Sequence, residues 1–358
     1  MQIEPNRLQR IQKLRLLMQQ NEVDAFIVVK AENIYYLSGF TSGEDALLLI
    51  TGTDKFILTD ARYSEQLKQE APDWNLLQGK PGSLDELKEV TLDCQRIGIE
   101  DSIVYRQFCE LHKQLPNKMT ALSGLVEELR IIKDETELDL MRKCASISDI
   151  VFSRLLDFIK PGITEIEVAN FIANALREGG CQKEAFDTIA VSAENAALPH
   201  GKPGKRLLTE GDMLTLDFGG IYAGYCADMT RTVVIESASQ RLHSLYEQVF
   251  SAQMAGVAAV KPGITAAQVD KIVRDCLAVA GLDKYFVHGT GHGLGLEVHE
   301  KPTVSPRGTG YLEENMVITI EPGIYIPGWG GIRIEDSVIV KSGGCEIITC
   351  SDKNLILI

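Results

Sequence analysis

Hydrophobic and polar positions divide the chain into an alternating first part and a second part that repeats itself. Over residues 1–124, helical patterns such as RLQRIQKLRLLMQQ alternate with short apolar runs typical of strands, namely DAFIVV, DALLLIT, KFILTD and RIGIE. This alternation predicts an α/β N-terminal domain. The next segment, GLVEELRIIKDETELDLMRKCASISDIVFSRLLDFI, predicts helices that join the two parts, with Asp134 as an N-cap.

The second part, residues 125–358, contains an internal repeat. The sequence KPGIT occurs at residues 160–164 and again at 261–265. A helical pattern follows each copy, over residues 165–180 and 266–281, and each pattern ends at glycine, as helices often do. Two copies are too few for a solenoid. They predict one α+β domain with two similar halves that pack about a pseudo-twofold axis.

Each half then offers two carboxylates at equivalent positions. The repeat continues with His-x-Lys-Pro, a strand-like run that ends on an acid, Gly-Ile-Tyr, and a second strand that begins at an acid. The acids that end strands are Asp217 and Glu321, and those that open strands are Asp228 and Glu335. Because pseudo-twofold symmetry brings equivalent positions together, the sequence predicts that these four carboxylates meet at the centre of the domain.

Four converging carboxylates have a chemical consequence. Like charges close together are tolerated only if they are protonated or neutralised by cations. Four carboxylates and one histidine form an oxygen-rich shell that suits two divalent ions, manganese first, with cobalt, iron or zinc as alternatives. The competing interpretation is that the four acids are solvated strand ends that never meet, and the repeat argues against it.

Three of the six histidines, His288, His292 and His299, lie in the segment FVHGTGHGLGLEVHEKP. Its interspersed glycines disfavour a helix, since each costs about 1 kcal/mol relative to alanine, and they predict an extended or looping segment. His292 has glycines on both sides, so it is predicted to be the nitrogen ligand. His299 and its repeat mate His200 are predicted to flank the metals and to hydrogen-bond a substrate carbonyl or a tetrahedral intermediate.

Charge and composition exclude several other functions. A net charge of -14 argues against binding to nucleic acid or to anionic membranes. No apolar run reaches the length of a membrane span, and the first residues lack the apolar core of a signal peptide. Eight scattered cysteines without a CxxC predict reduced thiols in a cytoplasmic protein and argue against a thiolate zinc site. His112 and His243 fit no such pattern and are predicted to have packing or surface roles.

The set Asp217, Asp228, His292, Glu321 and Glu335 resembles the five metal ligands of the pita-bread metallopeptidases, family M24. This family includes methionine aminopeptidase, Xaa-Pro aminopeptidase and prolidase. The motifs TLDFGGIYAGYCADMTRT, HGTGHGLGLEVHE, TIEPGIY and GIRIED match in order and spacing. The stretches NIYYLSGF and FILTDARY resemble the creatinase/prolidase N-terminal domain. Methionine aminopeptidases usually lack that domain, so the resemblance narrows to the Xaa-Pro peptidases.

The resemblance also implies a role for each ligand. Asp217 would bind one metal ion, His292 and Glu321 would bind the other, and Asp228 and Glu335 would bridge the two. A hydroxide shared by the two ions would attack the scissile carbonyl. Glu321 would also carry a proton from that water to the leaving imino nitrogen.

Four further residues and the assembly follow from the same resemblance. His200 and His299 would polarise the carbonyl and stabilise the oxyanion, while His288 would line the proline pocket. Arg333 is expected to pair with a ligand carboxylate such as Asp228 and to hold it in place. Relatives are commonly dimers, so a homodimer is expected.

The substrate is expected to be a peptide with proline at its second position. Many prolidase-like sequences carry arginine after the proline of HExP, where it could meet the carboxylate of a dipeptide, but this chain has Thr303 there and Arg307 further on. The first expectation is therefore an Xaa-Pro aminopeptidase, and the alternative is an Xaa-Pro dipeptidase. A metal-free creatinase and a non-catalytic pita-bread binding protein are disfavoured because all five ligands are present.

Overall fold

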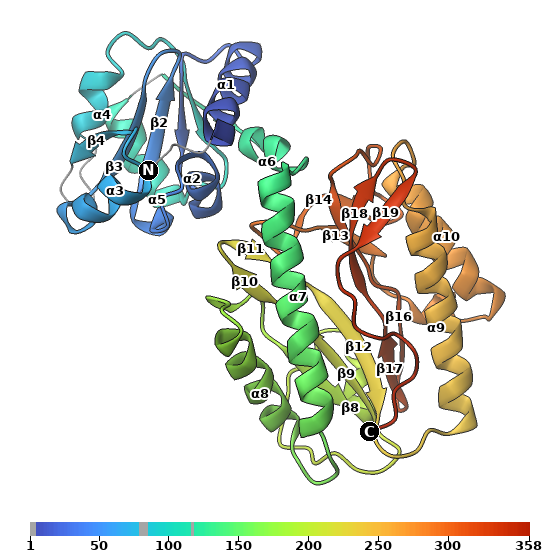
Figure 1. Ribbon diagram of the computed structural model, residues 1–358. Helices are drawn as coiled ribbons and strands as arrows, with labels where there is room; N and C mark the ends of the chain where they lie inside the picture. Colours follow the sequence, from blue (N-terminus) through green and yellow to red (C-terminus); the bar gives the residue numbers. More distant parts are fainter. Residues whose placement is uncertain (1–4, 79–84, 116–117) are drawn as a thin grey trace. The chain divides into compact units, whose positions relative to one another are not determined.

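The computed structural model describes residues 5–78, 85–115 and 118–358 of the chain. The chain divides into two compact units, and the boundary lies between Arg130 and Ile131 (Figure 1). The sequence predicted the change of domain a few residues earlier, after position 124. Each unit has its own hydrophobic core.

The described part of the first unit is built on a six-stranded mixed sheet with the order β4-β3-β2-β1-β5-β6. The β1–β2 and β2–β3 pairs are antiparallel, whereas β3–β4, β1–β5 and β5–β6 are parallel. The strands are β1 (Ala25–Val28), β2 (Leu47–Thr51), β3 (Lys55–Thr59), β4 (Asn75–Gln78), β5 (Ile97–Glu100) and β6 (Met119–Leu122). The helices are α1 (Pro5–Gln20), α2 (Ala31–Ser38), α3 (Ser64–Glu70), α4 (Asp85–Val90), α5 (Tyr105–Gln114) and α6 (Leu125–Arg130). The predicted α/β pattern is confirmed.

The helices of the second unit begin where the sequence predicted. Helix α7 (Glu135–Phe158) starts after Asp134, whose side chain accepts a hydrogen bond from the Glu137 amide in a capping box. Helices α8 (Glu165–Glu178) and α10 (Ala266–Val279) start after repeat mates Thr164 and Thr265, which form the same capping box. Helix α9 (Gln240–Ala259) precedes α10.

The KPGIT repeat is a repeated turn as well as a repeated sequence. Gly162 and Gly263 have φ angles of +88° and +86°, in the left-handed region that glycine adopts without strain. Their amides donate to the carbonyls of Leu208 and Leu312, at 2.8 Å in both cases. The two halves of the unit therefore fold alike at this point.

The strands of the second unit form two principal antiparallel sheets, with the orders β12-β9-β8 and β14-β13-β15-β18-β19. Helices α7 and α8 pack on the first of these sheets, and α9 and α10 pack on β15 and β18 of the second (Figure 1). The strands of the two sheets are β8 (Ile189–Ser192), β9 (Met213–Phe218), β12 (Met229–Val234), β13 (Gly291–Gly293), β14 (Glu300–Val304), β15 (Val317–Ile320), β18 (Asp336–Lys341) and β19 (Gly344–Ile347). The smaller strands are β7 (Lys183–Glu184), β10 (Gly220–Tyr222), β11 (Tyr225–Cys226), β16 (Gly323–Ile326) and β17 (Gly330–Arg333).

Two further expectations concern the whole chain. Among the described helices, none combines the length and the apolar character that a membrane crossing requires. All eight cysteines are free thiols, and Cys144, Cys181 and Cys226 are among the buried ones.

Candidate metal centre

The two sheets place the four carboxylates of the repeat. Strands β9 and β12 are antiparallel, so Asp217 near the end of β9 and Asp228 just before β12 lie at the same end of the pair. Strands β15 and β18 pair in the same way, with Ile320 opposite Asp336, which brings Glu321 and Glu335 to one end. The predicted strand positions of the acids are therefore confirmed.

His292 connects the two carboxylate pairs. Asp228, His292 and Glu335 each offer one donor atom, and these three atoms lie within 4.8 Å of one another. The His292 Nε2 atom is 3.3 Å from Glu321 Oε1 and 3.6 Å from Asp228 Oδ2. These distances bring four of the five predicted ligands, Asp228, His292, Glu321 and Glu335, together around one imidazole ring.

The orientation of His292 is fixed by its other ring nitrogen. Nδ1 lies 3.0 Å from the carbonyl oxygen of Gly293, so it donates there and leaves Nε2 facing Glu321 and Asp228. Metal-binding histidines commonly donate their second ring N–H to a carbonyl or carboxylate in this way. A Cβ atom at Gly291 would lie 1.9 Å from the Thr319 oxygen, and one at Gly293 would lie 2.2 Å from the Lys301 oxygen. The glycines are therefore required for the close approach of neighbouring strands.

Asp217 is held by Arg333. The Arg333 Nη2 atom donates to Asp217 Oδ2 at 2.6 Å, and both side chains are largely buried. The expected partner, Asp228, is not the carboxylate that the guanidinium binds. Arg333 is the last residue of β17, and from there its side chain extends to Asp217 near the end of β9. Arg333 does pair with one of the predicted ligand carboxylates, but Asp228, the example named from the sequence, was wrong.

Burial and crowding oppose the charges of these acids. Burial raises the pKa of Asp228 well above its usual value, and repulsion from Glu335 raises it further. Burial also raises the pKa of Glu335 strongly, with added repulsion from Glu321 and Asp217. Burial would raise the pKa of Glu321 too, but the hydrogen bond with His292 and the nearby positive charges lower it to about 2. A divalent cation between the acids would remove the repulsion that keeps them from ionising together.

Two carboxylate oxygens of the cluster have no hydrogen-bond partner among the described residues and are therefore free to bind a cation. Asp217 Oδ1 and Glu335 Oε1 are buried and accept no hydrogen bond from the described residues. Buried polar atoms without a partner are costly, and each requires an explanation. A bound cation supplies one, because carboxylate oxygens and one imidazole suit a hard or borderline divalent ion. The residues present therefore fit the predicted metal.

The other predicted histidines surround this cluster in different ways. The ring of His299 lies 4.4 Å from that of His292, centroid to centroid, and burial lowers the pKa of His299. His200 is exposed, and the carbonyl of the preceding residue, Pro199, accepts a hydrogen bond from Arg333 Nη1 at 3.3 Å. Both histidines can therefore remain available to a ligand beside the carboxylates.

His288 is engaged at both ring nitrogens. Nδ1 lies 2.8 Å from the carbonyl oxygen of Gly289, and Nε2 lies 2.8 Å from the hydroxyl of Tyr325. Burial lowers the pKa of His288 and so favours the neutral ring. This ring donates a hydrogen bond from Nδ1 and accepts one from the Tyr325 hydroxyl at Nε2. The ring also packs against Phe286, with the two ring centroids 5.0 Å apart, and its predicted place in a proline pocket remains a prediction.

Two further polar residues belong to the site, although the sequence pattern did not indicate them. Tyr325 accepts a hydrogen bond from Arg333 Nη1 at 2.7 Å and so links that guanidinium to His288. Thr230 donates from Oγ1 to Glu335 Oε2 at 2.7 Å and accepts from Arg333 Nε at 3.1 Å. Both stand in motifs already noted, the repeated Gly-Ile-Tyr and TLDFGGIYAGYCADMTRT, but spacing alone does not reveal their partners.

Two family models match the chain, one over each unit. The family model described as metallopeptidase family M24 matches residues 139–342, and that of the creatinase/prolidase N-terminal domain matches residues 10–132. The chain is 36% identical over 349 residues to a protein from Pyrococcus horikoshii named Xaa-Pro dipeptidase, covering 97% of this chain and 99% of that one.

Two solved structures are similar over almost the whole chain. One is described as an Xaa-Pro dipeptidase from Bacillus anthracis, with a TM-score of 0.95 and 38% identity, covering 98% of this chain and 100% of that one. The other is described as an X-Pro aminopeptidase from Thermotoga maritima, with a TM-score of 0.88 and 35% identity, covering 94% and 98%. Similarity at this level extends to both units.

Proposed function

Because the chain belongs to metallopeptidase family M24, we propose that it is an Xaa-Pro dipeptidase, which hydrolyses the bond between an N-terminal residue and a following, terminal proline. The observation that carries this proposal is the full-length similarity to proteins named Xaa-Pro dipeptidase, from Bacillus anthracis and Pyrococcus horikoshii. Both units of the chain are covered, and all five predicted ligands are present. The aminopeptidase expected from Thr303 becomes the second candidate, supported by the Thermotoga maritima structure.

The proposed ligands are Asp217, Asp228, His292, Glu321 and Glu335. Divalent ions held there would lower the pKa of water to about 7 and so supply a nucleophile at neutral pH. We propose two ions per chain, with manganese as the first candidate and cobalt, iron and zinc as alternatives.

The proposed roles of the other residues follow from their contacts. Glu321, next to His292, would accept a proton from the attacking water and deliver it to the leaving imino nitrogen. His200 and His299 would donate hydrogen bonds to the oxygen that becomes negative as the carbonyl is attacked. Arg333 would hold Asp217 in place, and His288 would line the proline pocket with its ring carbons.

Substrate length separates the two candidate activities. A dipeptide presents a free carboxylate on its proline, and burying an unpaired carboxylate is costly, so a dipeptidase must supply a cation. We expect kcat/KM for an Xaa-Pro dipeptide to exceed that for the matched Xaa-Pro-Yaa tripeptide by about a hundredfold, or about 2.7 kcal/mol. Equal rates, or a preference for the tripeptide, would favour the aminopeptidase instead. Arg307, which is exposed, is the first cation to replace with alanine if the dipeptide is preferred.

The sorting of the histidines gives a second expected result. His200→Ala and His299→Ala should each lower kcat by roughly 10²-fold or more, as the loss of an oxyanion donor does. His112→Ala and His243→Ala serve as controls, because both side chains are exposed, in α5 and α9 respectively. Steady-state kinetics at saturating metal measures all four variants. Equal kcat values across the set would show that the sorting is wrong.

A further inference from the structure

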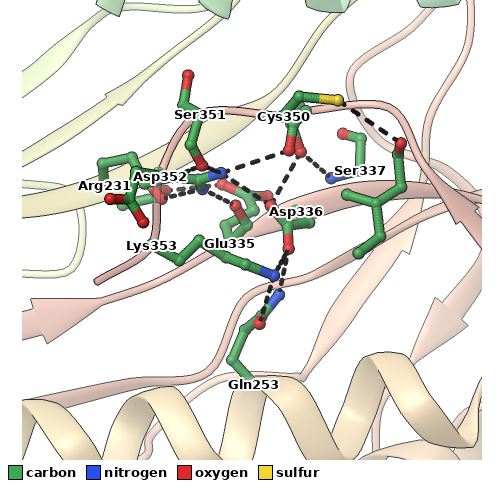
Figure 2. A network of polar contacts seen from close by, with 12 residues as sticks. Arg231, Gln253, Glu335, Asp336, Ser337, Cys350, Ser351, Asp352 and Lys353 are labelled. Carbon is green, nitrogen blue, oxygen red and sulfur yellow. Dashed lines mark hydrogen bonds and ion pairs between the residues drawn. The ribbon is translucent and has the colours of Figure 1, made fainter.

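A buried ion pair next to the candidate metal centre has no role in the proposed chemistry (Figure 2). Arg231 of β12 donates from Nη2 to Asp336 Oδ1 of β18 at 2.9 Å, and these side chains are 1% and 0% exposed. Lys353 Nζ also contacts Asp336, whose Oδ2 accepts from Gln253 Nε2 at 2.8 Å. Burying two charges is unfavourable unless their hydrogen-bonding groups find well-placed partners, and the contacts of Arg231 and Asp336 supply such partners.

The pair is attached directly to a predicted bridging ligand. Asp336 follows Glu335 in the chain, and Arg231 Nη1 donates to the carbonyl oxygen of Glu335 and, at 2.9 Å, to that of Thr230. The Glu335 amide donates to the Thr230 carbonyl at 3.1 Å. The backbone of Glu335 is therefore held at both its N–H and its carbonyl, and its side chain is held by the Thr230 hydroxyl.

The second bridging ligand is tied to the same place. Ser337, next after Asp336, donates from Oγ to the carbonyl oxygen of Asp228 at 2.8 Å. Strands β12 and β18 belong to different sheets, which come from different halves of the repeat. The contacts of Arg231, Asp336 and Ser337 thus join the two halves at the point where the bridging ligands lie.

The C-terminal segment 349–353 completes this arrangement (Figure 2). The carbonyl of Ser351 accepts from Arg231 Nη2 at 2.8 Å, and the Thr349 hydroxyl donates to Asp336 Oδ1 at 3.1 Å. The Ser351 amide and hydroxyl in turn donate to Asp149 Oδ1 of α7, at 2.8 and 2.5 Å. The segment therefore holds both members of the Arg231–Asp336 pair.

We propose that the Arg231–Asp336 pair, completed by segment 349–353, is a positioning unit that sets the metal affinity of the centre. It acts through the backbones of Glu335 and Asp228 and does not touch substrate. Groups behind metal ligands fix the direction of the ligand atoms, and small errors in that direction weaken binding. This inference rests on the proposed metal centre and adds the residues that determine how tightly the ions are held.

Asp336→Asn tests the proposal, since it keeps the shape of the side chain and removes the charge that pairs with Arg231. Titration calorimetry of the full chain should show Mn²⁺ affinity weakened by about 10- to 100-fold. The visible absorption of the Co²⁺ form should change in shape, and kcat should recover at saturating metal with little change in KM. Asp212→Asn is the matched control, because Asp212 is a buried acid that pairs with Arg206 at 2.5 Å and adjoins no ligand. Its metal affinity should equal that of the wild type.

A folded Asp336→Asn chain with wild-type Mn²⁺ affinity and a wild-type Co²⁺ spectrum would overturn the proposal. If that variant does not fold, Lys353→Met removes one partner of Asp336 from a side chain that is 15% exposed. Weakened Mn²⁺ binding in Lys353→Met would support the positioning unit, and unchanged binding would overturn it. Failure of the wild-type chain to bind any divalent ion would instead refute the proposed function, so the two failures are distinguishable.

Discussion

Glu321→Gln should lower kcat for an Xaa-Pro dipeptide by about 10³-fold, because it alters a ligand and removes the proposed proton carrier together. General acid–base catalysis alone contributes roughly 10²- to 10⁴-fold. The pKa of Glu321 is lowered to about 2, despite the burial that would raise it, by the hydrogen bond with His292 and by nearby positive charges. Its carboxylate is therefore ionised across the neutral range, as a metal ligand must be. The amide of glutamine cannot take up the proton that the carboxylate is proposed to carry, and it is a weaker metal ligand than a carboxylate.

The matched control for this variant is Glu314→Gln. Glu314 precedes β15 in the same chain segment, and its side chain is exposed. Both variants are measured at saturating Mn²⁺, and the melting temperature checks that each is folded. A Glu321→Gln chain that keeps kcat within tenfold of the wild type would show that another group carries the proton.

The positions of the four carboxylates could be predicted because the sequence of the second unit contains an internal repeat. The repeat alone pairs Asp217 with Glu321 and Asp228 with Glu335 as equivalent positions. Strand ends are readable from the alternation of apolar and polar residues, and antiparallel pairing brings neighbouring ends together. His292 could be predicted because flanking glycines allow backbone to approach closely.

The partners of the basic residues could not be read in the same way. Arg333 lies two positions before Glu335, yet it binds Asp217, because the direction of a long side chain depends on the strand that carries it. Arg231 sits in the motif ADMTRT, but its acceptors are Asp336 and carbonyls as far along the chain as Ser351. Such contacts join segments more than one hundred residues apart. The pattern of neighbouring residues along the chain therefore cannot predict them.

Three expectations remain predictions. The homodimer, the cytoplasmic location and the choice of manganese were drawn from composition or from resemblance to other proteins. The geometry of the centre bears on the class of metal through its ligand types, and availability also decides which ion is bound.

Metal removal should abolish activity outright, since no other group in the proposed site activates water as a bound divalent ion would. Asp217 Oδ1 and Glu335 Oε1 are buried without hydrogen-bond partners among the described residues, and burial raises the pKa of both acids. Without divalent ions the acids cannot all ionise together and no water is activated, so catalysis loses its nucleophile.

The most direct test is turnover of an Xaa-Pro dipeptide by chelator-stripped protein to which Mn²⁺ is returned in measured amounts. We expect no measurable turnover in the stripped chain, and recovery of kcat as the ions occupy the site, with calorimetry giving two per chain. Full turnover by protein shown to be free of metal would contradict the proposed metal centre.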